Sequence, residues 1–258
     1  MANTAKLASK IWKKPLTTSY HTDAASYSKF YVEKICGFFP KKINHFFVNV
    51  LKVPQRMEIR IKNKIRKYFR SCRYAMIDEN FDKSFLSSDF IGNCKISKLS
   101  RGVDLDVFKI KEVNRASFFR KYNIPLNDKL IFFCGRIHEL KGAILLSKIH
   151  KALNQKGINM TTVLAGQKIE EEKCQKIGGN KLKIVGYLKQ EEVASFYNIC
   201  DLFVFPSLYE TGPQVVLEAK ACNAVCVVSP SGGGRKIKKN GFDGIIIKKY
   251  DERSWTSR

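Results

Sequence analysis

From about residue 109 to its end, the chain alternates short apolar runs with segments of helical pattern. The runs are bounded by glycine, proline or polar residues, as buried strands are in a parallel sheet covered on both faces. The alternation therefore predicts an α/β fold, a doubly wound parallel sheet, for this part of the chain. The predicted strands are 130–134, 160–165, 182–185, 202–205, 224–229 and 244–248, and the predicted helices are 143–156, 190–199 and 213–223.

The first 108 residues have a less regular pattern. Residues 1–14 are expected to form a polar, lysine-bearing lead-in, and 101–108 a linker. The long stretch after the first strand has helical patterns broken at Gly37–Pro40 and at Pro54. We therefore expect two domains, 1–108 and 109–258. In the first domain the sequence predicts strands at 15–20, 73–77 and 95–99 and a short helix at 80–88.

The segment PSLYETGPQVVLEAKAC at 206–222 follows the predicted strand at 202–205 and leads into a helix. Ligands of open α/β sheets bind where such a loop joins the carboxyl end of a strand to the next helix. The amino end of that helix attracts phosphate, and Pro213 suits its first turn. Glu210 lies in the loop, and Glu218 about two turns along the helix. The two carboxylates lie at different depths of the expected site and can accept hydrogen bonds from hydroxyl groups, while the helix start attracts phosphate. The site therefore suits a ligand that carries both hydroxyl groups and phosphate.

The run from Glu210 to Ala219 resembles the E-x7-E motif of glycosyltransferase family 4, whose members are retaining, nucleotide-sugar-dependent transferases with the GT-B fold. CGRIHELKG at 134–142 resembles the family's G-R-L-x-x-x-K-G segment. LAGQ, VGYL and LFVFPS follow in the family's order. Upstream, RGVDLDVF resembles the interdomain linker, and TSYHTDAASY resembles a strand of the amino-terminal domain with its loop. The ordered series covers about residues 15–250 and carries more weight than any one match.

The resemblance implies a GT-B-like fold with a role for each matching residue. Arg136 and Lys141 would neutralise the donor diphosphate, since guanidinium and ammonium groups both suit phosphate. Glu218 would accept hydrogen bonds from the ribose; it lies among apolar neighbours, where a carboxylate without a partner is costly. Without the resemblance, Arg136 and Lys141 would be interpreted as ordinary residues of a solvated basic loop. The resemblance also assigns Glu210 and His21 to catalysis at the transferred sugar, and Gly212, Pro213 and Gln214 to donor binding at the helix start.

The resemblance further implies transfer of a hexose from a nucleotide diphosphate sugar to a lipid, glycolipid or polysaccharide acceptor, with retention of configuration. We expect neither a metal nor a cofactor, because no metal-ligand cluster is evident. The family's acidic residue after the glycine turn is replaced around Arg235–Lys236, which leaves a donor contact there in doubt. The family's opening strand, its glycine-rich loop and its closing helix are not found. We therefore expect an incomplete Rossmann-like amino-terminal domain and a chain truncated at both ends.

Charge is the outlying property of the composition: 47 Lys and Arg against 23 Asp and Glu give +24. The densest segment is 56–73, where Ile61, Ile65, Tyr68 and Phe69 recur at roughly helical spacing. Such a helix can be simply solvated, can lie on an anionic membrane surface, or can contact nucleic acid. Nucleic acid is the least favoured partner, because no recognition-helix, zinc-finger or RNA-binding signature accompanies the charge.

The expected location is the cytoplasm. Peripheral attachment to the inner face of a membrane is the alternative location, suggested by the basic segment 56–73. No apolar run is long enough to span a bilayer, and we expect no secretory signal, because the first residues include lysines but no continuous apolar region. The eight cysteines lack zinc spacing and are expected to be reduced. Two alternatives stay open: a non-catalytic remnant or fragment that binds a nucleotide sugar, and a basic nucleic-acid-binding protein.

Overall fold

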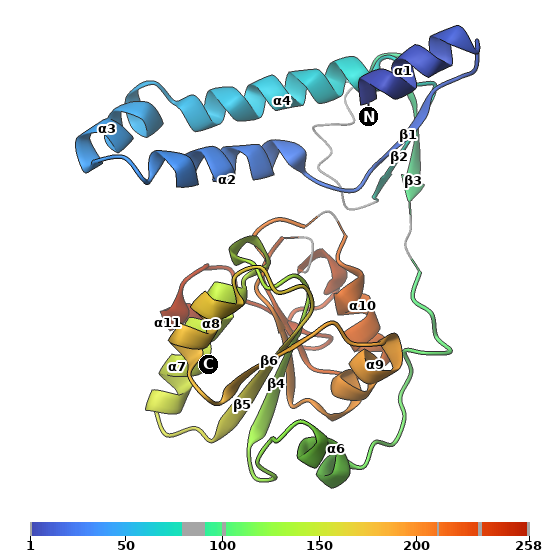
Figure 1. Ribbon diagram of the computed structural model, residues 1–258. Coiled ribbons are helices and arrows are strands. Elements are labelled where there is room, and N and C mark those ends of the chain that lie inside the picture. Colours follow the sequence, from blue (N-terminus) through green and yellow to red (C-terminus); the bar gives the residue numbers. More distant parts are fainter. Residues whose placement is uncertain (1, 79–90, 100–101, 211, 232–233, 257–258) are drawn as a thin grey trace. The chain divides into compact units, whose positions relative to one another are not determined.

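The computed structural model describes residues 2–78, 91–99, 102–210, 212–231 and 234–256 (Figure 1). The chain separates into two compact units, 1–100 and 101–258. Each unit has its own parallel sheet and its own apolar core. The helix predicted at 80–88 lies outside the described residues. Within the described residues, no helix combines the length and the hydropathy needed to cross a membrane.

The second unit is built on a six-stranded sheet whose neighbouring strands all pair in parallel. Its order is β6-β5-β4-β7-β8-β9, so the first strand of the unit, β4, has the second and the fourth as its neighbours. A doubly wound sheet has its switch point at such a position. The predicted strands are confirmed to within two residues: β4 is Lys129–Cys134, β5 Met160–Ala165, β6 Leu182–Gly186, β7 Leu202–Phe205, β8 Cys226–Val228 and β9 Ile245–Ile246.

Helices cover both faces of this sheet (Figure 1). Phe132 of β4 stacks on Phe196 with ring centroids 4.5 Å apart, and the next residue, Phe133, points to the opposite face. Both faces of β4 are therefore buried, which is why its sequence is apolar throughout. One face carries α7 (Ala143–Gln155), α8 (Glu171–Gly178) and α11 (Glu252–Thr256); the other carries α9 (Gln190–Ile199) and α10 (Gln214–Ala221); α6 (Arg115–Lys121) precedes β4.

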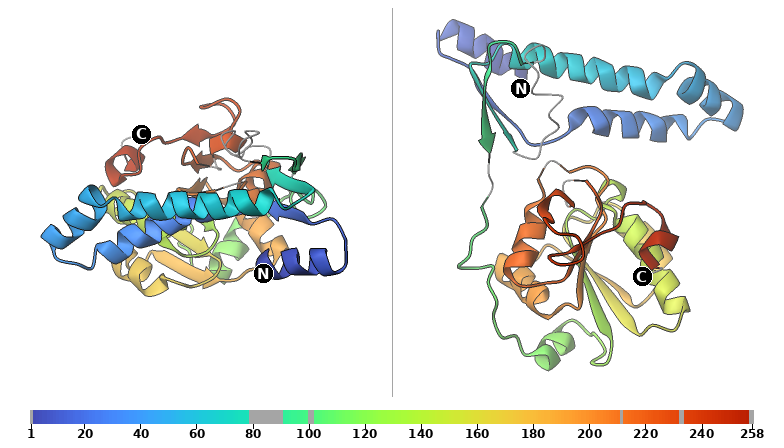
Figure 2. Two further views of the ribbon diagram at one scale, coloured as in Figure 1. Left: turned by 90° about the horizontal axis from the view of Figure 1, so that it is seen from above. Right: turned by 180° about the vertical axis from the view of Figure 1, so that it is seen from behind.

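The first unit has three parallel strands in the order β1-β2-β3. Between β1 and β2 the chain forms a hairpin of two helices, α2 and α4, that lie side by side (Figures 1 and 2). Asp23 caps α2 by accepting the Ser26 N–H. The bounds are α1 (Ala2–Ile11), β1 (Thr17–Tyr20), α2 (Ala24–Cys36), α3 (Lys41–His45), the π-helix η1 (Phe46–Val50), α4 (Val53–Phe69), β2 (Tyr74–Asp78) and β3 (Lys95–Leu99).

The apolar side of α4 belongs to the core of the first unit. Phe69 is buried and contacts Tyr20 edge to face at 5.9 Å, while Ile65 and Tyr68 pack against the same cluster. The exposed side carries Arg56, Arg60, Lys64, Arg66 and Lys67. The helix therefore presents cations to solvent, while the side expected to rest on a membrane is largely covered by the unit itself.

Candidate functional site at the switch point

The candidate site lies where β4 and β7 run side by side and the chain turns outward from each. Parallel strands bring their carboxyl ends to one edge, so the loop after β4 meets the loop after β7 there. The first loop carries Arg136 and Lys141, and the second carries Glu210. The topology alone thus explains why residues about seventy positions apart come together.

Lys141 and Glu210 form an ion pair across this edge. Lys141 Nζ lies 2.5 Å from Glu210 Oε1, and the exposed fractions of the two side chains are 15% and 11%. Such a pair is less screened than one on an open surface. The site therefore holds a cation suited to phosphate against a carboxylate suited to hydroxyl groups.

Ser207 holds the Glu210 carboxylate from the other side. Its Oγ lies 3.0 Å from Glu210 Oε1 and 3.1 Å from the Leu140 carbonyl oxygen, so one hydroxyl proton is shared between two acceptors. The Leu140 carbonyl also accepts the Leu208 N–H at 2.9 Å. The short 3₁₀ helix η3 (Glu139–Lys141), which carries Lys141, is therefore bonded directly to the loop that carries Glu210.

A glycine makes this close approach of the two loops sterically feasible. Gly142 has φ +84°, and a Cβ built on it would lie 2.2 Å from the Pro206 carbonyl oxygen. Any side chain there would push the two loops apart, in addition to being strained by the backbone angle. Gly142 thus fixes the distance over which Lys141 reaches Glu210.

The loop after β8 is tied to the same point. The Ser207 carbonyl oxygen accepts a hydrogen bond from Ser231 Oγ at 2.7 Å and a short one from Ser229 Oγ. Three loops at the carboxyl edge are therefore joined through Ser207: by its hydroxyl to the loops after β4 and β7, and by its carbonyl to the loop after β8. Gly232 and Gly233, in the glycine turn, and Thr211, beside Glu210, lie outside the described residues.

Glu218 lies half-buried on α10, and burial raises the pKa of its carboxyl group above the ordinary value. The hydroxyl of Tyr197 lies near enough to favour its charged form, and so opposes that shift. This hydroxyl is fully buried but stands outside hydrogen-bond geometry to any partner among the described residues. Cys134, the last residue of β4, lies near both groups. Glu218 thus lies near the carboxyl end of β4, where the loop with Arg136 begins.

The other residues predicted for the donor site surround this edge. Arg136 is exposed and has no ion pair among the described residues. Gly212 and Pro213 are buried, and α10 begins one residue later than expected, at Gln214. No side chain caps α10, so its first amide groups are available to a ligand. The Gln214 side chain donates to the Gly102 carbonyl oxygen at 3.0 Å.

His21 belongs to the first unit. It follows β1 directly and its side chain is exposed. The structure thus brings Lys141 and Glu210 together, with Glu218 near the same strand end, and it places His21 on a separate unit.

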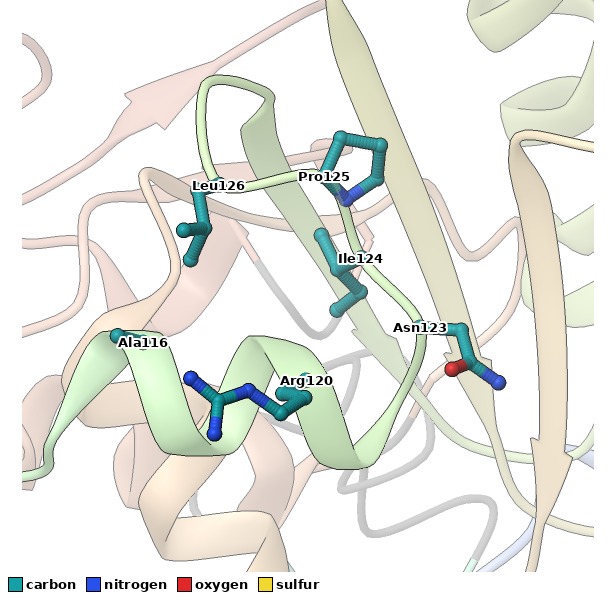
Figure 3. A pocket seen from close by; sticks show the side chains of 6 residues that line it. All are labelled: Ala116, Arg120, Asn123, Ile124, Pro125 and Leu126. Atoms are coloured by element: carbon teal, nitrogen blue, oxygen red, sulfur yellow. The ribbon is translucent and has the colours of Figure 1, made fainter.

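Within the described residues, no three His, Cys, Asp or Glu side chains gather closely enough to hold a metal ion. Asp104 and Asp106 have Asp-x-Asp spacing, but Asp104 Oδ1 accepts the Asp106 N–H at 3.0 Å, as in a local turn. A hollow of about 420 Å³ lies beside α6; Figure 3 shows the side chains that line it. None of the predicted site residues lines that hollow; its walls are Ala116, Arg120, Asn123, Ile124, Pro125 and Leu126.

Sequence reasoning missed Ser207 and Tyr197. Ser207 ends the run LFVFPS. Its place between the strand at 202–205 and Glu210 could have indicated a hydroxyl group that contacts the carboxylate. Tyr197 gave no signal, because an aromatic residue on the apolar side of a helix has the pattern of a core residue.

Three comparisons with known proteins bear on the family and the fold of the chain. Residues 114–258 match the family model described as Glycosyl transferases group 1. EpsF of Bacillus subtilis is 33% identical over 143 residues, which are 53% of this chain and 36% of that protein. An Escherichia coli protein named UDP-Gal:alpha-D-GlcNAc-diphosphoundecaprenol alpha-1,3-galactosyltransferase is 25% identical over 182 residues, 67% of this chain and 46% of its own length. The chain thus spans less than half of either relative.

Among solved structures, Anabaena HepE in complex with UDP and glucose superimposes with a TM-score of 0.71 at 15% sequence identity. The superposition covers 99% of this chain and 64% of that one. At this level of identity the likeness establishes the fold alone, which is a GT-B fold built on parallel α/β sheets.

Proposed function

Because this chain belongs to the group 1 glycosyl transferases, we propose that its second unit binds a nucleotide diphosphate sugar at the switch point between β4 and β7. The observation that carries the proposal is the Lys141–Glu210 ion pair, because it combines a phosphate-binding cation with a sugar-binding carboxylate at that point. A diphosphate would compete with Glu210 for the Lys141 ammonium group. Glu210 would then be released to a hydroxyl of the sugar.

The donor is held in three parts. Arg136, Lys141 and the first amides of α10, with Gly212, Pro213 and Gln214 around the helix start, receive the diphosphate. Glu218 accepts hydrogen bonds from the ribose hydroxyls. Glu210 contacts the transferred sugar, a hexose, beside the anomeric carbon. The half-buried position of Glu218 supports this division, since a buried carboxylate needs such partners.

In the reaction, the bond from the anomeric carbon to the diphosphate oxygen breaks and a bond to an acceptor oxygen forms, with retention of configuration. The nucleoside diphosphate leaves with the electron pair of the broken bond and the negative charge, and the proton of the acceptor hydroxyl passes to its departing oxygen. Arg136, Lys141 and the helix amides stabilise that charge without a metal ion. His21 is the residue of the first unit proposed to act at the sugar or on the acceptor side.

The proposed acceptor is a lipid, glycolipid or polysaccharide. The name of the Escherichia coli relative, which specifies a diphosphoundecaprenol acceptor, supports a lipid-linked one. A lipid-linked acceptor is reached from the membrane surface, so we place the protein in the cytoplasm, peripheral to the inner face of a membrane. The cationic side of α4, within residues 56–73, is the part of the first unit that an anionic surface would attract.

Titration calorimetry of the full chain with UDP-glucose, UDP-galactose and GDP-mannose tests the donor site. One of them is expected to bind, and Lys141→Met and Glu218→Gln are each expected to weaken that binding about tenfold or more. Lys148→Met is the matched control, because Lys148 is an exposed lysine on α7 away from the site. Binding that is equal in Lys141→Met and Lys148→Met would refute the assignment.

Transfer is tested with the same panel, a lipid-linked acceptor and product analysis by mass spectrometry. Glu210→Ala and Arg136→Ala are expected to abolish transfer in a folded protein. Donor binding without transfer or donor hydrolysis would instead favour a nucleotide-sugar-binding protein. Steeply salt-dependent binding to RNA, with no affinity for UDP or GDP, would favour the nucleic-acid alternative.

A further inference from the structure

The far end of the α2–α4 hairpin exposes a cluster of large apolar side chains. We call residues 35–52 the hairpin tip; they run from the last turn of α2 through α3 and η1 to the start of α4 (Figure 2). Phe38 is 81% exposed, more than any other large apolar side chain that the structure describes. None of these side chains takes part in the core of the first unit. The exposed apolar residues of the tip are Ile35, Phe38, Phe39, Ile43, Phe46 and Val50.

The aromatic rings of the tip contact each other rather than the core. Phe47 lies with its ring centroid 5.8 Å from that of Phe39 and 6.1 Å from that of Phe46. The rings of Phe39, Phe46 and Phe47 therefore form one continuous apolar surface, and the exposed Phe38 is the immediate neighbour of Phe39 in the chain. A contiguous surface of this kind marks an interaction site, whereas single exposed apolar residues need no explanation.

The charges around this surface are all of one sign. Between Glu33 and Glu58 the sequence contains no acidic residue. Lys41 and Lys42 are exposed and lie between the apolar residues, while the exposed cations of α4 continue the positive surface from Arg56. The basic residues of this interval are Lys34, Lys41, Lys42, Lys52 and Arg56.

We propose that the hairpin tip inserts into an anionic lipid bilayer surface, with Phe38, Phe39 and Phe46 at the boundary between headgroups and acyl chains. The lysines bind lipid phosphates, which is the arrangement that interfacial apolar and basic residues adopt on anionic membranes. A second copy of the chain fits less well, because two tips of like charge would repel each other. A nucleic acid fits less well because it offers no apolar phase for the rings.

The membrane contact then lies at the tip and not on Ile65, Tyr68 and Phe69 of α4, which pack in the core of the first unit, and the cations of α4 contribute electrostatic attraction. Insertion of the tip would bring the first unit to a membrane-bound acceptor, and this role rests on the proposed function. Binding of the tip to vesicles does not depend on that function. Vesicle binding is therefore measured without sugar nucleotide. Donor affinity is measured separately on each variant, so that either idea can fail alone.

Cosedimentation of the full chain with phosphatidylcholine vesicles, with and without phosphatidylglycerol, tests the proposal. We expect binding that requires the anionic lipid. The double variant Phe38→Ser/Phe46→Ser should bind these vesicles at least about tenfold more weakly than the native chain. Lys41→Gln/Lys42→Gln should also lower the affinity for them. Phe242→Ser is the matched control, because Phe242 is 80% exposed in the second unit. Circular dichroism and unchanged donor affinity verify the fold of each variant.

Insertion is separated from surface adsorption by a tryptophan placed in the tip. In a Trp12→Phe background, Phe38→Trp should shift its emission to shorter wavelength on vesicles and be quenched by lipids brominated in the acyl chain. Native vesicle affinity in the Phe38→Ser/Phe46→Ser variant, or no quenching, would overturn the proposal. Tip-dependent self-association in sedimentation velocity without vesicle binding would also overturn it, in favour of an interface between copies.

Discussion

Ser207 is the smallest side chain in the candidate site and the one with the most connections. Its hydroxyl lies between the Glu210 carboxylate and the Leu140 carbonyl oxygen, and it is fully buried. Without this hydroxyl, the Leu140 carbonyl oxygen keeps a second donor, the Leu208 N–H, whereas Glu210 keeps only Lys141 among the residues that the structure describes. The hydroxyl therefore matters more for the orientation of Glu210 than for the cohesion of the loops.

Ser207→Ala is predicted to lower the rate of sugar transfer about tenfold, with a smaller change in donor affinity, because the freed Glu210 samples unproductive orientations. Steady-state kinetics that separate kcat from the donor KM check this. Ser231→Ala is the control, since it removes a hydroxyl bonded to Ser207 O without touching Glu210. Equal effects of the two substitutions would mean that Ser207 merely packs the loop.

The raised pKa of Glu218 predicts a pH dependence of donor binding. Its charged form is the better acceptor for ribose hydroxyls, and burial shifts its protonation to a higher pH than that of an ordinary glutamate. Donor affinity should therefore fall on acidification at a pH above 4.5, the unshifted value. Glu218→Gln should remove this acid limb, whereas the exposed Glu172→Gln should keep it. Calorimetry across the pH range measures both, and an unchanged limb in Glu218→Gln would contradict the assignment.

Sequence reasoning at this scale recovered residues that carry charge and missed those that orient them. Lys141 and Glu210 follow successive motifs, and the parallel order of β4 and β7 brings them to one edge. No spacing rule states that Ser207 shares its proton between two loops, because that depends on how close Gly142 lets Pro206 come. Contacts set by tertiary approach have no local pattern.

At the scale of elements, α7 is fastened to β5 by a buried histidine. His150 Nδ1 lies 2.9 Å from Thr162 Oγ1, and its Nε2 lies 2.9 Å from the Asn154 side-chain amide. Burial lowers the pKa of His150 to about 4, and nearby Lys181 acts in the same direction while Asp128 opposes it. The neutral ring is thus part of the packing between helix and sheet.

This histidine predicts that the second unit loses stability in acid. The pKa is about 4 when folded against 6.5 unperturbed, so the unfolded chain binds the proton more tightly. Stability is full above pH 6.5 and falls as the pH decreases toward 4, by at most about 3 kcal/mol. Urea unfolding followed by the buried Trp255 measures it. His150→Gln should flatten this slope and exposed His45→Gln should leave it; a slope unchanged in His150→Gln would contradict the prediction.

The elements predicted from sequence are those with an apolar side. All six strands of the second unit and helices α7, α9 and α10 were predicted, because each buries a run or stripe of large side chains. Helix α8 was missed because Cys174 is its only buried residue among those described. Helix α1 was not predicted: residues 1–14 were expected to form a polar, lysine-bearing lead-in, because the segment has few apolar residues, and Leu7 and Ile11 are exposed in the structure.

At the scale of the whole chain, the two units differ greatly in how much they bury. The first unit's described core has six buried residues, including Phe69 and Tyr20, whereas the core of the second unit extends over both faces of a six-stranded sheet. A small core contributes little stability, so the first unit is expected to be the less stable one.

Unfolding is accordingly predicted to occur in two steps. In a Trp12→Phe background, far-ultraviolet circular dichroism should show the helices of the first unit melting at lower urea than the transition reported by Trp255 fluorescence. Phe69→Ala, a truncation costing about 3–5 kcal/mol in a core, should abolish the first step and leave the Trp255 transition in place. A single transition for both probes, shifted as a whole by Phe69→Ala, would show that the units unfold as one.

The carbonyl groups of Leu140 and Ser207 each accept two hydrogen bonds: Leu140 from two residues of the loop after β7, and Ser207 from two residues of the loop after β8. Each oxygen therefore ties its own loop to the next one twice, and neither loop can move away without breaking both bonds. The loops after β4, β7 and β8 are consequently expected to move as one rigid body, so that a ligand displacing one of these loops would have to displace the other two. Selectivity at such an edge comes from shape fixed in advance rather than from a flap that adapts to what it meets.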